Sequence, residues 1–263
     1  MNDKTIAFSI AAAFLMTGCI TSFDGTIIPA SSSTLEHEMM EGVYKAPNDV
    51  QMAFRAYVPN DAMPNSIPLI VYLHGAGQNG DDNKRQLDEG VGCLYSFTTG
   101  RDDYKSMIAV PQCPAGVYWR DDDVLEALRD FILAMAENPI VDKDRIYITG
   151  FSMGGDASWK LALNYPDLMT TIVPVCGGPL ASMEPDIPDV PPEMSLLNIW
   201  AFNNFDDGVV RPAYSKRIFG ELWSESDSDK LNFTLNVSGG HSAEKVYKNR
   251  DILIWMLSTR KND

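Results

Sequence analysis

The fold is indicated most directly by the stretch Ile146-Tyr-Ile-Thr-Gly-Phe-Ser-Met-Gly-Gly-Asp-Ala-Ser-Trp159. It joins an apolar run, typical of a buried strand, to a segment compatible with a helix, and it places Ser152 in a Gly-x-Ser-x-Gly turn between them. Gly150 and Gly154 lack the Cβ atoms that would collide in so tight a turn. We therefore expect the Ser152 hydroxyl to project at the carboxyl end of a strand, above a helix N-terminus that favours negative charge.

Outward from this turn, the chain alternates between strand-like and helix-like segments. Continuous apolar runs predict about eight strands, and apolar residues at helical spacing predict the helices between them. Strands that alternate with helices build a mostly parallel sheet with helices on both faces, so the chain is predicted to be a one-domain α/β protein. The strands are expected at 38–44, 51–58, 68–73, 106–110, 145–149, 171–175, 196–202 and 231–237, and the helices at 121–137, 153–165, 211–223 and 243–257.

Composition narrows the function classes. The 263 residues are 45% hydrophobic and 22% charged, an ordinary globular balance, and the formal net charge is -15. Nucleic-acid binding calls for basic patches, so this acidity argues against a nucleic-acid partner. The absence of coiled-coil heptads favours a monomer.

The first residues have the pattern of an export signal. Residues 6–16 are apolar but too few to span a bilayer, and they run into Leu15-Met-Thr-Gly-Cys19. This resembles a bacterial lipoprotein signal. The resemblance implies a signal peptide over 1–18, a lipid on the Cys19 thiol, a linker over 19–36 and a catalytic domain over 37–263. We expect a lipid-anchored protein of the bacterial cell envelope, with ordinary secretion as the alternative.

Three further cysteines leave the redox state open. Cys93 and Cys113 could pair in an oxidising compartment, or all three, including Cys176, could be small buried thiols. No Cys-x-x-Cys or histidine-rich spacing is present, so we expect neither a metal nor another cofactor.

A serine hydroxyl needs a base to act as a nucleophile, and the histidines limit the choice. After a nucleophile elbow the acid and then the histidine follow along the chain. Of His37, His74 and His241, only His241 lies downstream of Ser152, so it is the candidate base. His74 directly follows a predicted strand and is expected to be structural, with its ring hydrogen-bonded beneath the following loop.

The acid should follow the penultimate strand. Asp206 and Asp207 both stand there, and Asp186 and Asp189 in a proline-rich loop are more distant alternatives. The acid would hold the His241 ring in one tautomer and stabilise its protonated form.

Two backbone N–H groups are expected to hold an oxyanion. One belongs to Met153, the residue after the nucleophile, and the other comes from the loop after the first buried strand. Within that loop, His74-Gly-Ala-Gly77, we select Ala76. Trp119 lies in a predicted loop and is the aromatic residue that we expect to contact a substrate.

Four stretches together resemble a known family. They are Tyr72–Asn83, Ala109–Pro114, Asp142–Gly155 and the pair Gly240-His241. The chain resembles the serine esterases of the α/β-hydrolase fold that are often labelled predicted peptidases, which stand near the polyhydroxybutyrate-depolymerase and feruloyl-esterase groups.

The resemblance implies an α/β-hydrolase fold and selects the acid. The family writes His-Gly-x-x-Asp-x-x-Val around it, and Asp207-Gly-Val-Val210 matches the end of that pattern. Asn203-Asn204 stand where His-Gly is usual, which could alter the floor of the pocket.

The resemblance also implies hydrolysis of carboxylic esters, with acyl groups of the feruloyl or acetyl type on carbohydrates or small molecules as the expected substrates. A serine peptidase of the same fold is one alternative. The other is a noncatalytic glycan-binding lipoprotein, against which an intact Ser152, Asp207 and His241 in the right order argues.

Overall fold

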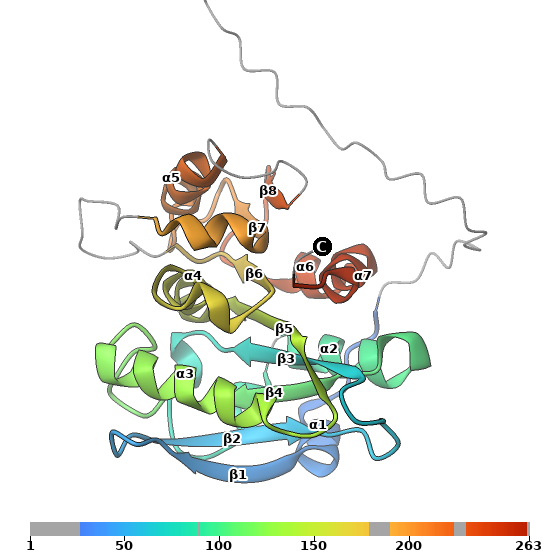
Figure 1. Cartoon of the computed structure of the whole chain (residues 1–263). Coiled ribbons are helices and arrows are strands. Elements are labelled where there is room, and N and C mark those ends of the chain that lie inside the picture. The colour runs from blue at the N-terminus through green and yellow to red at the C-terminus, as the bar shows by residue number, and fades with distance from the viewer. Residues whose placement is uncertain (1–26, 89, 179–189, 224–229, 262–263) are drawn as a thin grey trace, which may run out of the picture.

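The structure is a computed structural model that describes residues 27–88, 90–178, 190–223 and 230–261. Within them, eight strands form one sheet with helices on both faces (Figure 1). The strands are β1 (Met40–Lys45), β2 (Gln51–Tyr57), β3 (Ile67–Leu73), β4 (Met107–Pro111), β5 (Val141–Phe151), β6 (Thr171–Val175), β7 (Asn198–Asn204) and β8 (Leu231–Asn236). The helices are α1 (Ser32–Glu38), α2 (Val91–Thr99), α3 (Asp122–Ala136), α4 (Met153–Asn164), α5 (Pro212–Trp223), α6 (Glu244–Tyr247) and α7 (Arg250–Ser258).

The strand order is β1-β2-β4-β3-β5-β6-β7-β8. β1 pairs antiparallel with β2 and β2 antiparallel with β4, whereas all the strands from β4 to β8 in this order run parallel. The predicted class, a mostly parallel sheet of eight strands, is confirmed. Because the parallel strands end at one edge, the loops after β3, β5, β7 and β8 meet there.

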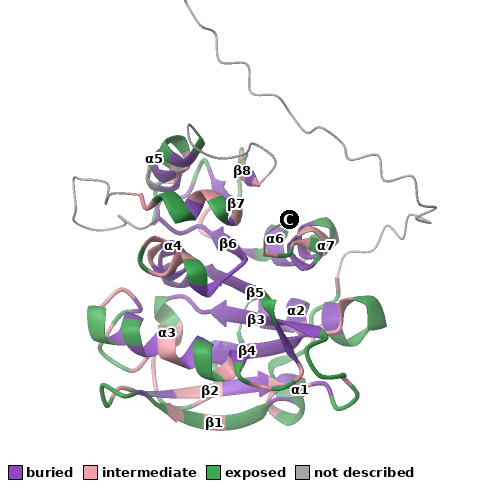
Figure 2. Cartoon of the chain, viewed as in Figure 1, coloured by how far each residue is buried: buried purple, intermediate pink, exposed green. Residues whose placement is uncertain are grey.

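Both faces of the sheet are covered, which explains the apolar strands. α3, α4 and α5 pack on one face, and α1, α2, α6 and α7 pack on the other. Along β3 the side chains alternate between the two: Leu69 and Val71 join the first cluster, while Ile70 and Tyr72 join the second. Every residue of β3 is therefore buried, as the purple ribbon in Figure 2 shows.

The sequence did not predict two of the helices, and one predicted helix is divided into two in the structure. α1 and α2 were not expected, since each draws its order from packing more than from its own pattern. The amphipathic face of α2 is weak, but Leu94 and Phe97 are buried against the second cluster. The closing helix expected over 243–257 is divided into α6 and α7, with Asn249 capping α7 through its side chain.

The described part of the predicted linker belongs to the folded domain. Ile27 donates its backbone N–H to the Lys248 carbonyl at 3.4 Å, and Ala30 donates to the Gly92 carbonyl at 3.1 Å. The Leu35 side chain is only 1% exposed. The predicted boundary at residue 37 is therefore wrong, because residues 27–36 pack against the domain. Residues 1–26, which include the predicted signal peptide and Cys19, lie outside the described residues.

The three remaining cysteines are free thiols in the described chain. Cys93 packs in the cluster on one face of the sheet and Cys113 in the cluster on the other. Because the sheet separates them, the disulfide that was left open does not form. None of the described helices has the length and apolar character that crossing a bilayer requires.

Candidate active site

Ser152 stands at a strained turn between β5 and α4. Its backbone has φ 56 and ψ -115, a conformation that a residue with a Cβ adopts only when its surroundings enforce it. The enforcement is steric: a Cβ placed on Gly154 would lie 1.8 Å from the Leu73 carbonyl oxygen, and one on Gly150 would lie 2.6 Å from the same atom. Ser152 also donates its N–H to the Val175 carbonyl at 2.9 Å. The predicted elbow is present.

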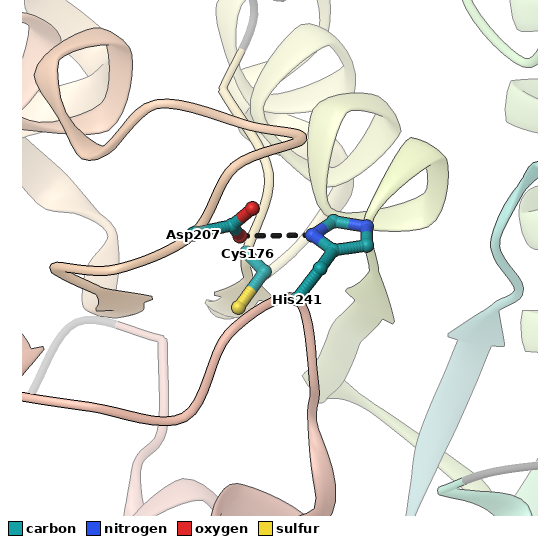
Figure 3. A group of neighbouring side chains, drawn as sticks. All are labelled: Cys176, Asp207 and His241. Carbon is teal, nitrogen blue, oxygen red and sulfur yellow. Dashed lines mark hydrogen bonds and ion pairs between the residues drawn. The ribbon is translucent and has the colours of Figure 1, made fainter.

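The structure brings together the three side chains that the sequence singled out. His241 Nε2 lies 2.8 Å from Ser152 Oγ, and His241 Nδ1 lies 2.8 Å from Asp207 Oδ2. Figure 3 shows the second of these contacts. The residues come from the loops after β5, β7 and β8, which end at the same edge of the sheet. In this arrangement the Ser152 proton can pass to the imidazole, while the Asp207 carboxylate stabilises the imidazolium that forms.

The two neighbouring aspartates have different tasks. Asp207 is buried and turns one oxygen to His241, while its other oxygen accepts the N–H groups of Val209 and Val210 at 2.8 and 2.9 Å. Asp206 instead accepts the N–H groups of Gly239 and Gly240 at 2.9 and 2.8 Å. Asp207 thus orients the imidazole, and Asp206 holds the loop that carries it. The alternatives Asp186 and Asp189 lie outside the described residues.

Asn204 gives that loop a second support that the sequence did not predict. Its amide nitrogen donates to the carbonyls of Gly240 and Ser242, at 2.7 and 3.2 Å, and its oxygen accepts from Asn236 at 2.9 Å. Its neighbour Asn203 is buried, and its amide atoms have no hydrogen-bond partner among the described residues. Asn204, which stands where the resembled family has glycine, therefore supports the loop that carries His241. The polar pair Asn203-Asn204 at the end of a buried strand is the sequence feature that could have indicated this support.

Two backbone N–H groups near Ser152 stand at helix starts. Met153 is the first residue of α4, and Ala76 is the first residue of the 3₁₀ turn Ala76–Gln78, so neither has an acceptor within its own helix. The loop lies close to the nucleophile, because a Cβ on Gly75 would stand 3.6 Å from Ser152 Cβ. The loop that carries Ala76 therefore lies close to Ser152, and Met153 follows Ser152 directly in the chain.

His74 fixes the oxyanion loop from below, as expected. Its Nε2 accepts the N–H of Cys113 at 2.9 Å, and its Nδ1 donates to the Gly75 carbonyl at 2.7 Å. Burial lowers the pKa of His74 from 6.5 to about 4, which keeps the ring neutral and able to accept at Nε2. Since this geometry needs one donor and one acceptor, it fits the neutral tautomer.

The predicted substrate contact of Trp119 is wrong. Its side chain is 0% exposed, and its indole N–H donates to the His74 carbonyl at 3.2 Å. The indole lies 5.1 Å from the imidazole of His74, measured between ring centres. Trp119 thus supports the oxyanion loop from within the core. Its position in a loop suggested exposure, but burial of so large an apolar surface outweighs loop placement.

Cys176 lies beneath the acid and the base. The atoms that Cys176, Asp207 and His241 could offer to a metal lie within 4.8 Å of one another (Figure 3). Burial and the nearby Asp207 carboxylate raise the pKa of the Cys176 thiol to about 12. The thiol donates to the Ser242 carbonyl at 3.5 Å. Cys176 therefore contributes to the support of the loop that carries His241.

One more titratable group lies in the first turn of α4. Asp156 is 9% exposed and accepts the N–H of Gly178 at 2.5 Å. Burial raises the pKa of its carboxyl from 3.8 to about 7, although the Gly178 hydrogen bond and the charge of Arg120 act in the opposite direction. Sequence reasoning missed this residue, because an aspartate early in a helix usually reflects the helix dipole alone.

Known proteins resemble this chain in sequence over part of its length. No protein-family profile matches the chain. The chain is similar to poly(3-hydroxyalkanoate) depolymerase C of Paucimonas lemoignei, with 26% identity over 161 residues, 60% of this chain and 39% of the depolymerase. It is also similar to poly(3-hydroxybutyrate) depolymerase of Ralstonia pickettii, with 24% identity over 179 residues, 60% of this chain and 35% of that protein. The chain thus spans well under half the length of these relatives.

Solved structures give the fold directly. A thermostable esterase matches with a TM-score of 0.76 and 26% identity, over 86% of this chain and 64% of the esterase. The feruloyl esterase module of Clostridium thermocellum matches with a TM-score of 0.64 and 14% identity, over 91% and 96% of the two chains. Prolyl oligopeptidase B of Galerina marginata shares the fold too, at 14% identity and over 37% of its length. The chain has the α/β-hydrolase fold, and its resemblance to the esterases of that fold is confirmed.

The different tasks of the aspartates lead to opposite expectations. Asp207→Asn would turn an amide toward His241 Nδ1 and disfavour the tautomer that accepts the Ser152 proton, so the rate at which a fluorophosphonate labels Ser152 should fall by about 10⁴. Asp206→Asn keeps an acceptor oxygen for Gly239 and Gly240, and labelling should stay within a few-fold of the wild-type rate. A large loss with Asp206→Asn and none with Asp207→Asn would reverse the assignment.

Asp156 should make stability depend on pH. Because the folded state raises the pKa of this carboxyl, it binds the proton more tightly than the unfolded chain. The stabilisation is complete below about pH 4 and is lost as pH rises through about pH 7. We expect the melting temperature of the wild type to fall over this range by more than that of Asp156→Asn. The exposed Asp167→Asn is the matched control, and identical pH profiles for all three proteins would refute the effect.

Proposed function

We propose that this protein is a serine hydrolase that cleaves carboxylic esters through an acyl-enzyme. The observation that carries the proposal is the continuous contact from Ser152 Oγ through His241 to the buried Asp207, set on a strained elbow. A serine, an imidazole and a carboxylate in this geometry generate an alkoxide-like nucleophile at neutral pH.

The reaction has two halves. Ser152 Oγ attacks the carbonyl carbon while its proton passes to His241 Nε2, and the N–H groups of Ala76 and Met153 hold the oxyanion. The carbon–oxygen bond to the alcohol then breaks, and the proton on Nε2 moves to the departing oxygen. A water molecule attacks the acyl-enzyme by the same route, which releases the carboxylic acid and restores Ser152.

We propose acyl groups of the feruloyl or acetyl type, carried by carbohydrates or small alcohols, as the substrates. Relatives named as depolymerases of polyesters and neighbours named as esterases support ester chemistry. The prolyl oligopeptidase likeness, at 14% identity, supports the fold and adds nothing in favour of peptide substrates. We further propose that the protein acts as a monomer.

The test of the proposed activity uses Ser152→Ala. Wild-type protein should release p-nitrophenol from the acetate and butyrate esters, and Ser152→Ala should lower kcat by at least about 10³-fold, because the hydroxyl is the attacking atom. Ser66→Ala is the matched control, since Ser66 is exposed and precedes β3 at the opposite end from the elbow. Equal turnover by wild type and Ser152→Ala would overturn the proposal.

We also propose that the protein is anchored in the bacterial cell envelope through a lipid on Cys19. The support is the apolar segment 6–16 and the sequence Leu15-Met-Thr-Gly-Cys19. Several acyl chains on one residue would give a stable anchor, whereas a single chain would not.

The anchor is tested in cells fed with labelled palmitate. The wild-type chain should carry the label and sediment with the membranes, and Cys19→Ser should carry no label and leave the membrane fraction. Cys93→Ser is the control, because Cys93 is buried in the folded domain. Retention of the label by Cys19→Ser would exclude Cys19 as the acceptor.

A further inference from the structure

A cavity of about 210 Å³ lies beside the imidazole of His241. We call it the His241 cavity. Its walls come from the segment before α1, from α2, from the elbow and from α6. The residues on which the argument depends are Pro29, Cys93, Phe151, Ala243, Tyr247 and Lys248.

The His241 cavity lies on one particular side of the reaction centre. Its lining within the described chain includes His241 but neither Ser152 nor the oxyanion donors Ala76 and Met153. The Phe151 ring packs on the His241 ring, with 4.7 Å between their centres, and the two rings line the cavity together. Within the described chain, the cavity therefore borders the imidazole and not the oxyanion donors.

This side is where the alcohol must depart. In the proposed reaction His241 Nε2 gives its proton to the oxygen of the breaking carbon–oxygen bond, so that oxygen and its substituent stand against the imidazole. We propose that the His241 cavity binds the alcohol part of the ester and thereby selects the leaving group. This inference rests on the proposed ester hydrolysis and deepens it.

The size and lining of the cavity define the alcohols that fit. At about 210 Å³ it is smaller than the pockets of about 300–1,000 Å³ that take drug-sized ligands, so it admits a single ring or a short chain. Phe151, Tyr247 and Ala243 give it apolar walls. Lys248 stands in the lining with its charge paired to Glu244, 2.6 Å away. Of the alcohols in the proposed substrates, the cavity thus favours a small one, a phenol or a short aliphatic alcohol, over a carbohydrate.

The wall that includes Pro29 is held in place by backbone contacts. Ala30 donates its N–H to the Gly92 carbonyl at 3.1 Å, and a Cβ on Gly92 would lie 2.4 Å from the Ala30 carbonyl oxygen. Since α2 has no side chain at this point, the segment packs directly on the helix. Pro29 therefore forms part of the specificity site, although it precedes the first helix.

Two substitutions change the cavity in opposite directions. Cys93→Leu enlarges a buried side chain that lines the floor, and Pro29→Gly removes an exposed wall residue without burying anything new. We would measure kcat/KM for two ester series. One holds the acyl group as butyrate and varies the alcohol from methanol through p-nitrophenol to a naphthol, and the other holds p-nitrophenol and lengthens the acyl chain.

The proposal predicts a change along the alcohol series only. Cys93→Leu should lower kcat/KM for the aryl esters relative to the methyl ester by about tenfold or more, because one misplaced methyl-sized group costs this much in a fitted pocket. Pro29→Gly should raise kcat/KM for the naphthyl ester relative to kcat/KM for the p-nitrophenyl ester. Selectivity along the acyl series, and the rate of deacylation of the common butyryl-enzyme, should remain at wild-type values.

Ala134→Leu is the matched control for side-chain enlargement, because Ala134 is exposed on α3, on the other face of the sheet. Should Cys93→Leu fail to fold, Ala243→Leu fills the same space. A shift along the acyl series, or no shift in either series, would overturn the assignment to the alcohol while leaving ester hydrolysis intact. Wild-type protein that hydrolyses no ester in either series would overturn the proposed function and this inference with it.

Discussion

The site depends on one steric constraint, the passage of the first turn of α4 against the end of β3. Any Cβ on Gly154 would overlap the Leu73 carbonyl oxygen, at 1.8 Å, so only glycine permits the two backbones to lie this close. The close passage holds Ser152 at φ 56 and sets it beside the loop that begins at His74. Backbone packing therefore places Ser152 beside the loop that carries Ala76.

Each half of the site rests on a support that does not take part in the chemistry. Beneath the loop that begins at His74, the neutral His74 ring bridges two backbone groups, and Trp119 donates its indole N–H to the His74 carbonyl. Beneath the His241 loop, Asp206 and Asn204 hold the backbone on either side of the imidazole. Because the supports engage backbone atoms, the reacting side chains remain free to exchange protons without loosening the loops that carry them.

The sequence predicted the features that depend on local chemistry and order along the chain. The elbow needs glycine on both sides of Ser152, and a base must lie downstream, so both could be found without coordinates. Residues 27–36 and α2 could not, since their order comes from partners distant in the sequence. Trp119 was misjudged for the same reason: its loop position is local information, whereas its burial depends on His74 and the core. The residues alone left the choice between Asp206 and Asp207 open, because both follow the same strand. The two differ only in where their side chains point, Asp207 toward His241 and Asp206 toward the backbone of Gly239 and Gly240.

The same distinction explains why the reaction is easier to infer than the substrate. The residues around Ser152 are constrained by proton transfer and charge, and such constraints leave a short motif that can be recognised in a sequence. The His241 cavity is constrained only by packing. Its walls come from segments that lie far apart in the chain, near Pro29, Cys93, Phe151 and Ala243. No sequence motif of fixed spacing therefore identifies the cavity. A change at Pro29, Cys93 or Ala243 alters this space while Ser152, Asp207 and His241 stay the same. Two chains with the same elbow and the same triad can therefore differ in the space beside the imidazole, and under the proposed assignment they would differ in the alcohol that they release.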